Sequence, residues 1–198
     1  MSDPIEFDPV DLISATGSNP MSDPIEFDPV DLISAGALGR PGARRFMIQA
    51  RKGATLLCVL LEKQQIADLA EEATRFLDGV ASDAPHESAL DPVNDALCGQ
   101  LEDTEPLFRA RMIGIGYDPE RHLVLLELRE QPEDFEGIPF EGLTGIEPEF
   151  HVARLYATRA QVRAMLRHGA ASVERGRPPC PLCDFPMDPD GHHCPRWN

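Results

Sequence analysis

The sequence predicts an α+β domain built on an antiparallel sheet of about five strands, with two helices on one face of the sheet. Three observations favour this class: short apolar runs separated by turn residues, two stretches with helical hydrophobic periodicity, and the order of these segments. The chain has 198 residues, of which 42% are hydrophobic. This suits one domain with tails.

The N-terminal region contains an internal repeat. Residues 1–15 and 21–35 are identical, and the second copy begins with its own methionine, Met21. We interpret Met21 as the ancestral start and residues 1–20 as a duplicated tail that we expect to be disordered. An alternative is that the first copy competes with the second for one docking groove. The glycines and proline of residues 36–42 predict an irregular turn.

Two strands and a helix are expected next. Residues 45–51 and 54–62 have the pattern of strands, and Lys52-Gly53 between them suits a tight hairpin turn. The second run is apolar on both faces, as in a central strand. From Lys63 the period becomes helical, and Ser82-Asp83 is expected to end the helix. Its apolar stripe comprises Ile66, Leu69, Ala70, Ala73, Phe76, Leu77 and Val80.

Acidic segments interrupt the second half of the domain. Residues 81–106 contain seven acids and no base, which predicts a mobile acidic loop. Strands are expected at 107–117 and 122–129, joined by a four-residue turn. A second acidic loop at 131–148 then precedes a fifth strand at 149–157. The short connections imply antiparallel pairing.

The second helix has a clear start signal. Thr158 and Gln161 fit a capping box, in which the hydroxyl accepts a hydrogen bond from the third helical amide and the glutamine reaches back. The helix is expected to end near Gly176, which places the α+β domain at residues 21–177. Its predicted buried stripe comprises Val162, Met165, Leu166 and Gly169.

Charge and hydropathy exclude several classes of protein. The formal net charge of −16 opposes a general attraction to nucleic acid or to anionic membranes. No apolar run approaches the ~20 residues that span a bilayer. The N-terminus lacks the basic and apolar regions of a signal peptide. We therefore expect a cytoplasmic protein with no membrane partner.

Residues 178–198 form the segment that carries recognisable chemistry. Cys180 and Cys183 have C-x2-C spacing, and Cys194 adds a third sulfur after turn-forming prolines and a glycine. His192 or His193 supplies a nitrogen, since adjacent histidines cannot easily both ligate one ion. A Cys3His set is soft, tetrahedral and closed, so it predicts a structural zinc knuckle.

The chain resembles an actinobacterial family known as a domain of unknown function. The resemblance rests on residues 27–51, 61–78 and 176–196, and most specifically on the tail pattern GRPPCPLC…DP.GH.CPR. It implies a cytoplasmic zinc-knuckle protein with His192 as the fourth ligand. It implies no activity, and the first copy of the repeat lies outside the family pattern.

Other candidate residues are weaker. Arg159, Arg163 and Arg167 recur along one face of the second helix and could bind an anion or a partner. The alternative interpretation is that these arginines form a solvent-exposed helix face that pairs with the chain's own acidic loops. Cys58 is expected to be buried, and Cys98 to be a thiol without a role. We expect Phe185, Met187 and Trp197 to pack the knuckle against the domain.

These features favour a non-enzymatic, zinc-binding interaction or adaptor protein with a protein partner. One alternative is a nucleic-acid or phospholigand binder that uses the arginine face and the knuckle. A second alternative is a zinc-dependent hydrolase with one labile ligand, although the sequence shows no catalytic geometry.

Overall fold

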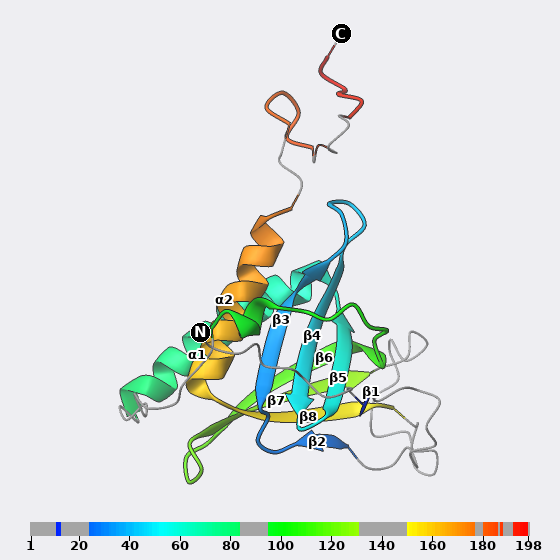
Figure 1. Ribbon diagram of the computed structural model, residues 1–198. Coiled ribbons are helices and arrows are strands. Elements are labelled where there is room, and N and C mark those ends of the chain that lie inside the picture. Colours follow the sequence, from blue (N-terminus) through cyan, green and yellow to red (C-terminus); the bar gives the residue numbers. More distant parts are fainter. Residues whose placement is uncertain are drawn as a thin grey trace, which may run out of the picture.

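The computed structural model describes residues 11–12, 24–83, 95–130, 150–176, 180–185, 187 and 192–197. These segments contain strands, two α-helices and a short 3-10 helix (Figure 1). The strands are β1 (Asp11–Leu12), β2 (Ile25–Phe27), β3 (Leu32–Leu38), β4 (Arg45–Lys52), β5 (Thr55–Leu61), β6 (Phe108–Asp118), β7 (Leu123–Glu130) and β8 (Val152–Thr158). The helices are α1 (Lys63–Asp83), η1 (Leu97–Gly99) and α2 (Arg159–Glu174).

The strands form one mixed sheet in the order β2-β8-β7-β6-β5-β4-β3, with β1 paired to β5 off this path. The predicted α+β class, with two α-helices, is confirmed. The expectation of a five-strand antiparallel sheet is wrong in two respects: β1, β2 and β3 are additional strands, and the pairs β1–β5, β5–β6 and β2–β8 are parallel. The parallel pairing of β5 with β6 follows from α1 between them, because a helical crossover returns the chain in the same direction.

The connection between β2 and β3 ties distant parts of the sheet together. The Val30 amide donates to the Tyr156 carbonyl of β8, and the Asp31 amide donates to the Arg51 carbonyl of β4, both at 2.8 Å. The sheet therefore bends back on itself, and β3, β4 and β5 run across β7 and β8 (Figure 1).

β3 occupies part of the segment expected to be an irregular turn. Its central residues 34–37 are small (Ser-Ala-Gly-Ala), so the strand pattern in the sequence is weak. Ile33 and Ala35 are buried, and the Ser34 hydroxyl donates to the Leu97 carbonyl at 3.0 Å. The true turn begins at Gly39, whose φ of 100° favours glycine.

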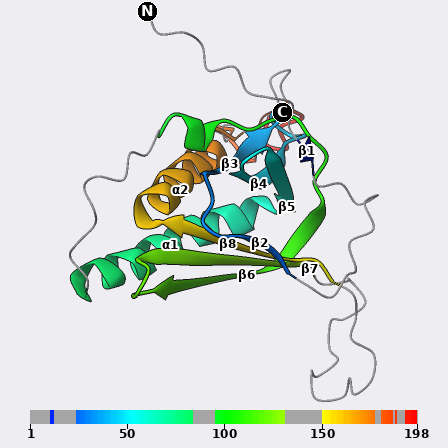
Figure 2. The same ribbon diagram turned by 60° about the horizontal axis from the view of Figure 1, so that its bottom comes forward.

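Side chains from α1, from α2 and from strands β2 to β8 pack together in one hydrophobic cluster. α2 packs against β3, and α1 packs against α2 (Figures 1 and 2). Gly169 permits this approach, because a Cβ there would lie 3.2 Å from the Ile66 side chain. The predicted helical stripes are confirmed for the buried positions Ile66, Leu69, Ala73, Leu77, Val162, Met165, Leu166 and Gly169. The other predicted positions, Ala70, Phe76 and Val80, are half-buried.

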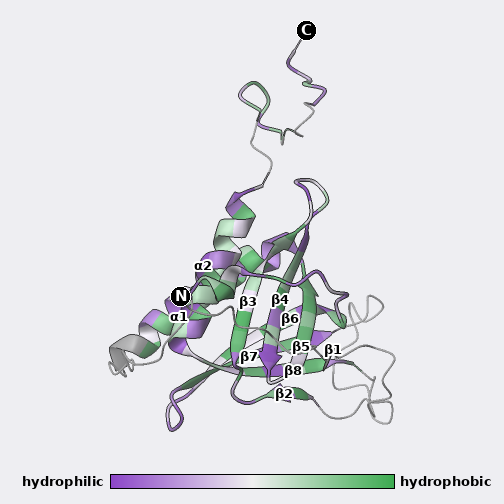
Figure 3. Cartoon of the chain, viewed as in Figure 1, coloured by the Kyte–Doolittle hydropathy of each residue, from purple (hydrophilic) through white to green (hydrophobic). Residues whose placement is uncertain are grey.

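The start of α2 and the predicted hairpin turns agree with the sequence. Thr158 and Gln161 form both hydrogen bonds of a capping box. Gly53, with a φ of 57°, lies in the β4–β5 turn. In Figure 3, hydrophobic residues follow the strands, and the tip of the β3–β4 hairpin is hydrophilic.

The outer face of β3, β4 and β5 is covered by residues 95–107, which we call the strap (Figure 2). The Gln49 side chain forms two hydrogen bonds with the backbone of the strap. Its Nε2 donates to the Glu102 carbonyl at 2.7 Å, and its Oε1 accepts from the backbone N–H of Glu102 at 2.8 Å. The Leu107 amide donates to the Cys58 carbonyl at 2.8 Å. The expectation of a mobile loop is therefore wrong for residues 95–106.

Both lone cysteines are buried by this arrangement. Cys58 is buried in β5, as expected, and Cys98 is buried in η1 of the strap. The sequence around Cys98 is polar, so its burial could not be predicted from the local sequence. The burial depends on packing of η1 against β3, which is distant in the chain. Burial raises the pKa of both thiols, so neither is an activated nucleophile.

An ion-pair network links β7 and β8. Glu127 lies opposite Arg154 in the strand register, and it accepts hydrogen bonds from Arg154 Nε at 2.8 Å and from Arg129 Nε at 2.6 Å. Burial opposes ionisation of Glu127, but these hydrogen bonds outweigh it and lower the pKa of the carboxyl group.

Some expectations fall on residues outside the described segments. They are residues 84–94 of the first acidic loop, the loop at 131–148 and most of the N-terminal tail, and the expectations for them stay predictions. Within that tail, Asp11–Leu12 pairs in parallel with Thr55 and Leu56 of β5. In the second copy, Leu32 pairs instead with Arg51 of β4. No described helix is both long enough and apolar enough to cross a membrane.

Candidate metal centre

The C-x2-C segment folds into a tight turn. The Asp184 amide donates to the Cys180 carbonyl at 2.9 Å, and the Cys180 amide donates to the Phe185 carbonyl at 2.8 Å. Asp184 adopts a φ of 62°, a conformation that Asp tolerates better than most residues. The turn brings the two sulfurs to one side of the backbone, because the residues between them carry the chain around.

The second half of the centre is held against the first. The Trp197 amide donates to the Cys194 carbonyl at 3.1 Å, which forms a turn after the last cysteine. The Arg196 Nη1 group reaches back and donates to the Leu182 carbonyl at 2.8 Å. The Arg196–Leu182 hydrogen bond therefore joins the two halves of the centre directly, in addition to the closeness of their sulfur and nitrogen atoms.

The structure brings Cys180, Cys183, His192 and Cys194 together. Their ligand atoms all lie within 4.8 Å of one another. The Cys180 and Cys194 sulfurs are 3.9 Å apart, and Cys183 Sγ is 3.2 Å from His192 Nε2. The edges of a zinc tetrahedron are about 3.8 Å between sulfurs and about 3.5 Å between sulfur and nitrogen. The donor set and its spacing therefore fit a metal such as zinc.

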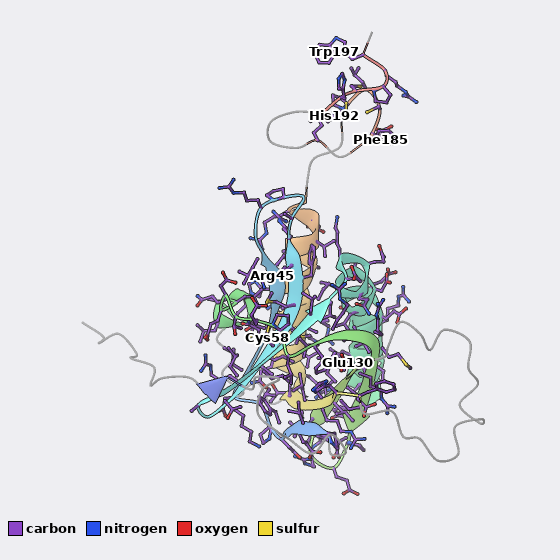
Figure 4. All side chains as sticks on the ribbon, turned by 90° about the vertical axis from the view of Figure 1, so that its right-hand side faces the viewer. Arg45, Cys58, Glu130, Phe185, His192 and Trp197 are labelled. Atoms are coloured by element: carbon purple, nitrogen blue, oxygen red, sulfur yellow. The ribbon has the colours of Figure 1, made fainter. Side chains whose placement is uncertain are left out.

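His193 lies outside this cluster and is exposed, whereas His192 is partly buried within it. The histidine favoured by the family resemblance is the one that the fold turns inward. Figure 4 shows His192 within the knuckle, between Phe185 and Trp197.

The cysteines differ in their ease of ionisation. Burial opposes ionisation of Cys180, but the amides of Leu182 and Cys183 outweigh it and lower the pKa of its thiol. Burial and the neighbouring sulfurs raise the pKa of Cys183. Because a metal binds thiolates, loading this centre releases protons.

Each arginine of the predicted face of α2 contacts another residue of the chain, and the prediction that the face binds an anion or a partner stays a prediction. Arg159 is buried beside the Tyr117 ring. Arg163 pairs with Asp78 at 2.9 Å, and Arg167 pairs with Asp95. The three residues stand apart from the metal cluster. The alternative of pairing with the chain's own acidic loops describes Arg167, whose partner Asp95 lies in residues 81–106, whereas Asp78, the partner of Arg163, lies on α1.

The expectation that the knuckle aromatics pack against the domain is wrong. Phe185 is 59% exposed and Trp197 is 78% exposed, and the knuckle lies beyond the end of α2 (Figures 1 and 4). Sequence reasoning also missed Leu182, which is 48% exposed. Its position between two cysteine ligands was the available signal, since a ligand turn directs its intervening side chains outward.

Fold and site together define an α+β protein with a C-terminal Cys3His group that could hold a metal such as zinc. Residues 25–194 match the family described as "Protein of unknown function (DUF3090)". The chain belongs to this family. The match begins within the second copy of the repeat and includes all four residues of the cluster. Comparison with curated proteins and with solved structures gives no match.

Proposed function

We propose that this chain is a zinc-binding interaction protein, whose knuckle presents apolar side chains to a protein partner. The observation that carries the proposal is the exposure of Leu182, Phe185 and Trp197 around one metal-binding cluster. The zinc is structural in this proposal, because four protein ligands fill a tetrahedral shell.

The metal supplies the order that this segment cannot obtain from a core. Its described residues are few, and their large apolar side chains point outward. Structural zinc contributes about 10–16 kcal/mol of apparent binding free energy in small zinc-finger peptides. That is enough to hold exposed aromatic side chains in a fixed arrangement.

The exposed side chains are of the kind that dominate protein interfaces. Tryptophan is among the residues most enriched at binding hot spots, and aromatic residues are enriched at interfaces generally. Among the described residues, Met112 is the other large hydrophobic side chain with high exposure, at 55%. Three of these four side chains lie on the knuckle, so the apolar surface is concentrated there.

Metal analysis tests the first half of the proposal. We expect one zinc per chain in protein purified under reducing conditions without chelator, and none after Cys180→Ser/Cys183→Ser. Cys58→Ser is the control, because Cys58 lies in β5. Absence of metal from the parent protein, or its retention by the double variant, would contradict the assignment.

Partner binding tests the second half. A partner should be identified by crosslinking in the source cells, purified, and titrated against the chain in vitro. Phe185→Ala/Trp197→Ala should weaken binding at least about tenfold, and so should chelation of zinc. Met112→Ala removes an equally exposed side chain from β6 and should leave affinity unchanged. Unchanged binding by the double variant would refute the proposed surface.

Nucleic-acid binding is a second candidate, favoured by the exposed aromatic pair, since such rings stack on bases. The net charge of −16 and the paired arginines of α2 oppose it. Steeply salt-dependent binding of a single-stranded oligonucleotide would support this candidate. A zinc hydrolase requires an open coordination position, so a cobalt spectrum typical of four protein ligands would exclude it.

A further inference from the structure

Most arginines of this acidic protein are paired with carboxylates, and two that line a cavity are not. Nine of them form ion pairs with carboxylates in the described segments; they are Arg45, Arg51, Arg75, Arg109, Arg121, Arg129, Arg154, Arg163 and Arg167. Arg44 and Arg175 differ. Within the described segments, their hydrogen bonds go to main-chain carbonyls, and no carboxylate lies within ion-pair distance of either.

These two arginines line one cavity of about 180 Å³. The cavity lies where the C-terminal half of α2 runs beside β3 (Figure 1). Small residues in and after β3 contribute much of its wall, and His168 and Ser172 of α2 also line it. We propose that this cavity binds a small phosphate group, either as the free ion or as the end of a small phosphate ester.

The polar groups of the cavity match that ligand. Arg44 Nη1 donates to the Ser172 carbonyl at 3.1 Å, and Arg175 Nε donates to the Ala171 carbonyl at 3.0 Å. Each contact uses one of the five N–H groups of a guanidinium. The remaining donors suit the bidentate geometry that arginine forms with phosphate.

His168 forms part of the wall between the cavity and the strap. Its Nε2 atom is buried and lies 3.4 Å from Asp95 Oδ2 in the strap, and Asp95 is also paired with Arg167. Because Nε2 faces the strap, the guanidinium groups of Arg44 and Arg175 are the charged donors that the cavity offers to a ligand.

The local charge favours an anion despite the acidic composition. The end of α2 contributes about half a negative elementary charge from its carbonyls, whereas the two guanidinium groups contribute two positive charges. Arg163 and Arg167 lie earlier on the same helix, and their charges are already matched by Asp78 and Asp95. The cavity is therefore a local positive site on an acidic protein.

The size of the cavity limits the ligand. Sites for drug-sized ligands enclose about 300–1,000 Å³, so 180 Å³ is small for a whole nucleotide. It exceeds the ~30 Å³ share of a water molecule several times over. A single phosphate group with a short organic substituent suits this volume.

Calorimetric titration of the full chain with inorganic phosphate and with glycerol phosphate tests the site. We expect saturable binding with one site per chain. Arg44→Gln or Arg175→Gln should weaken it about tenfold or more, because each removes a charged donor. Arg40→Gln is the matched control: it removes the same charge from the same hairpin without altering the wall. Its affinity should equal that of the parent.

A readout on the unsubstituted protein covers the case in which a variant fails to fold. Phosphate should shift the amide resonances of Gly36 and Gly99 and the ring resonances of His168, which line the cavity. Tighter binding of glycerol phosphate than of phosphate would identify an ester as the ligand, and the reverse order would identify the free ion.

Several results would overturn the proposal. They are no saturable binding of either probe, shifts confined to residues away from the cavity, or equal weakening by Arg40→Gln. Preference for malonate over both phosphate probes would assign the site to a carboxylate and overturn the phosphate assignment. The zinc knuckle stands apart from this cavity, so these outcomes leave the proposed function unaffected.

Discussion

Substitution of Gln49 by methionine should release the strap from the outer face of the sheet. Methionine has similar length and volume, so the contact with Met47 and Cys58 beneath the strap is largely kept. The change removes both hydrogen bonds to the backbone of Glu102, at 2.7 and 2.8 Å. Opening of the strap uncovers the sulfur of Cys58, which is buried.

The magnitude follows from these two hydrogen bonds. Each is worth about 0.5–1.5 kcal/mol net, so Gln49→Met should lower the free energy of strap closure by about 1–3 kcal/mol. Every 1.4 kcal/mol corresponds to a tenfold change in an equilibrium constant. The fraction of molecules with an open strap should therefore rise about 5- to 150-fold.

Thiol labelling followed by peptide mass spectrometry measures that fraction. Labelling of Cys58 should accelerate in Gln49→Met by the same factor as the opening equilibrium. The side-chain hydrogen bond from Gln49 lowers the pKa of Cys58 against the larger, opposing effect of burial. Loss of this hydrogen bond leaves less of Cys58 as the reactive thiolate, which slows its reaction with the label. Faster labelling in Gln49→Met must therefore arise from opening of the strap.

Gln64→Met is the matched control. Gln64 donates to Asp68 on the exposed face of α1 at 2.7 Å, and an exposed helical pair contributes only about 0.2–0.5 kcal/mol. The control should label at the parent rate. Equal Cys58 labelling in the parent and in Gln49→Met would refute the assignment of the strap to these hydrogen bonds.

Three further substitutions test the fold. Glu127→Gln should lower the free energy of unfolding by about 1–2 kcal/mol at neutral pH. Because folding lowers the pKa of Glu127, this difference in stability from the parent is fully present above the unfolded-state pKa and is lost as the pH falls through the folded-state pKa. Urea unfolding at a series of pH values measures this dependence. Thr158→Ala should cost about 1 kcal/mol by loss of the capping box, and an unchanged denaturation midpoint would contradict this. Gly169→Val should cost about 1–3 kcal/mol through overpacking against Ile66, seen as a lower melting temperature; a rise would show that the helices can separate.

The ligand set of the metal centre could be predicted from sequence because its geometry is local. Cys180 and Cys183 lie on one turn, and His192 and Cys194 follow within the same short segment. Spacing alone therefore constrains which atoms can meet. The choice between His192 and His193 needed the family resemblance or the folded chain, since sequence spacing permits either.

The surfaces that carry the functional proposals could not be predicted in the same way. Exposure of Phe185 and Trp197 depends on where the knuckle lies relative to the domain. The phosphate cavity depends on Arg44 from a hairpin meeting Arg175 from the end of a helix. Neither residue has a distinctive sequence context, and their shared property is that no carboxylate of the described segments lies within ion-pair distance.

The sequence by itself determined the elements with strong local signals. Helical periodicity located α1, the Thr158 capping box located the start of α2, and alternating or apolar runs located five strands. It also narrowed the candidate metal site to three cysteines and one of two adjacent histidines within one short segment. These features depend on contacts between residues close in the chain, so their information is present in any local window.

Tertiary structure decided the parallel pairings, the strap and the identity of β3 as a strand. The strap is polar and acidic in sequence, yet Gln49 satisfies the backbone of Glu102 from a distant strand. The centre of β3 consists of small residues with little intrinsic strand preference, and the strand packs against α2. Such choices depend on hydrogen bonds and burial between distant segments, which form only when the whole chain has folded.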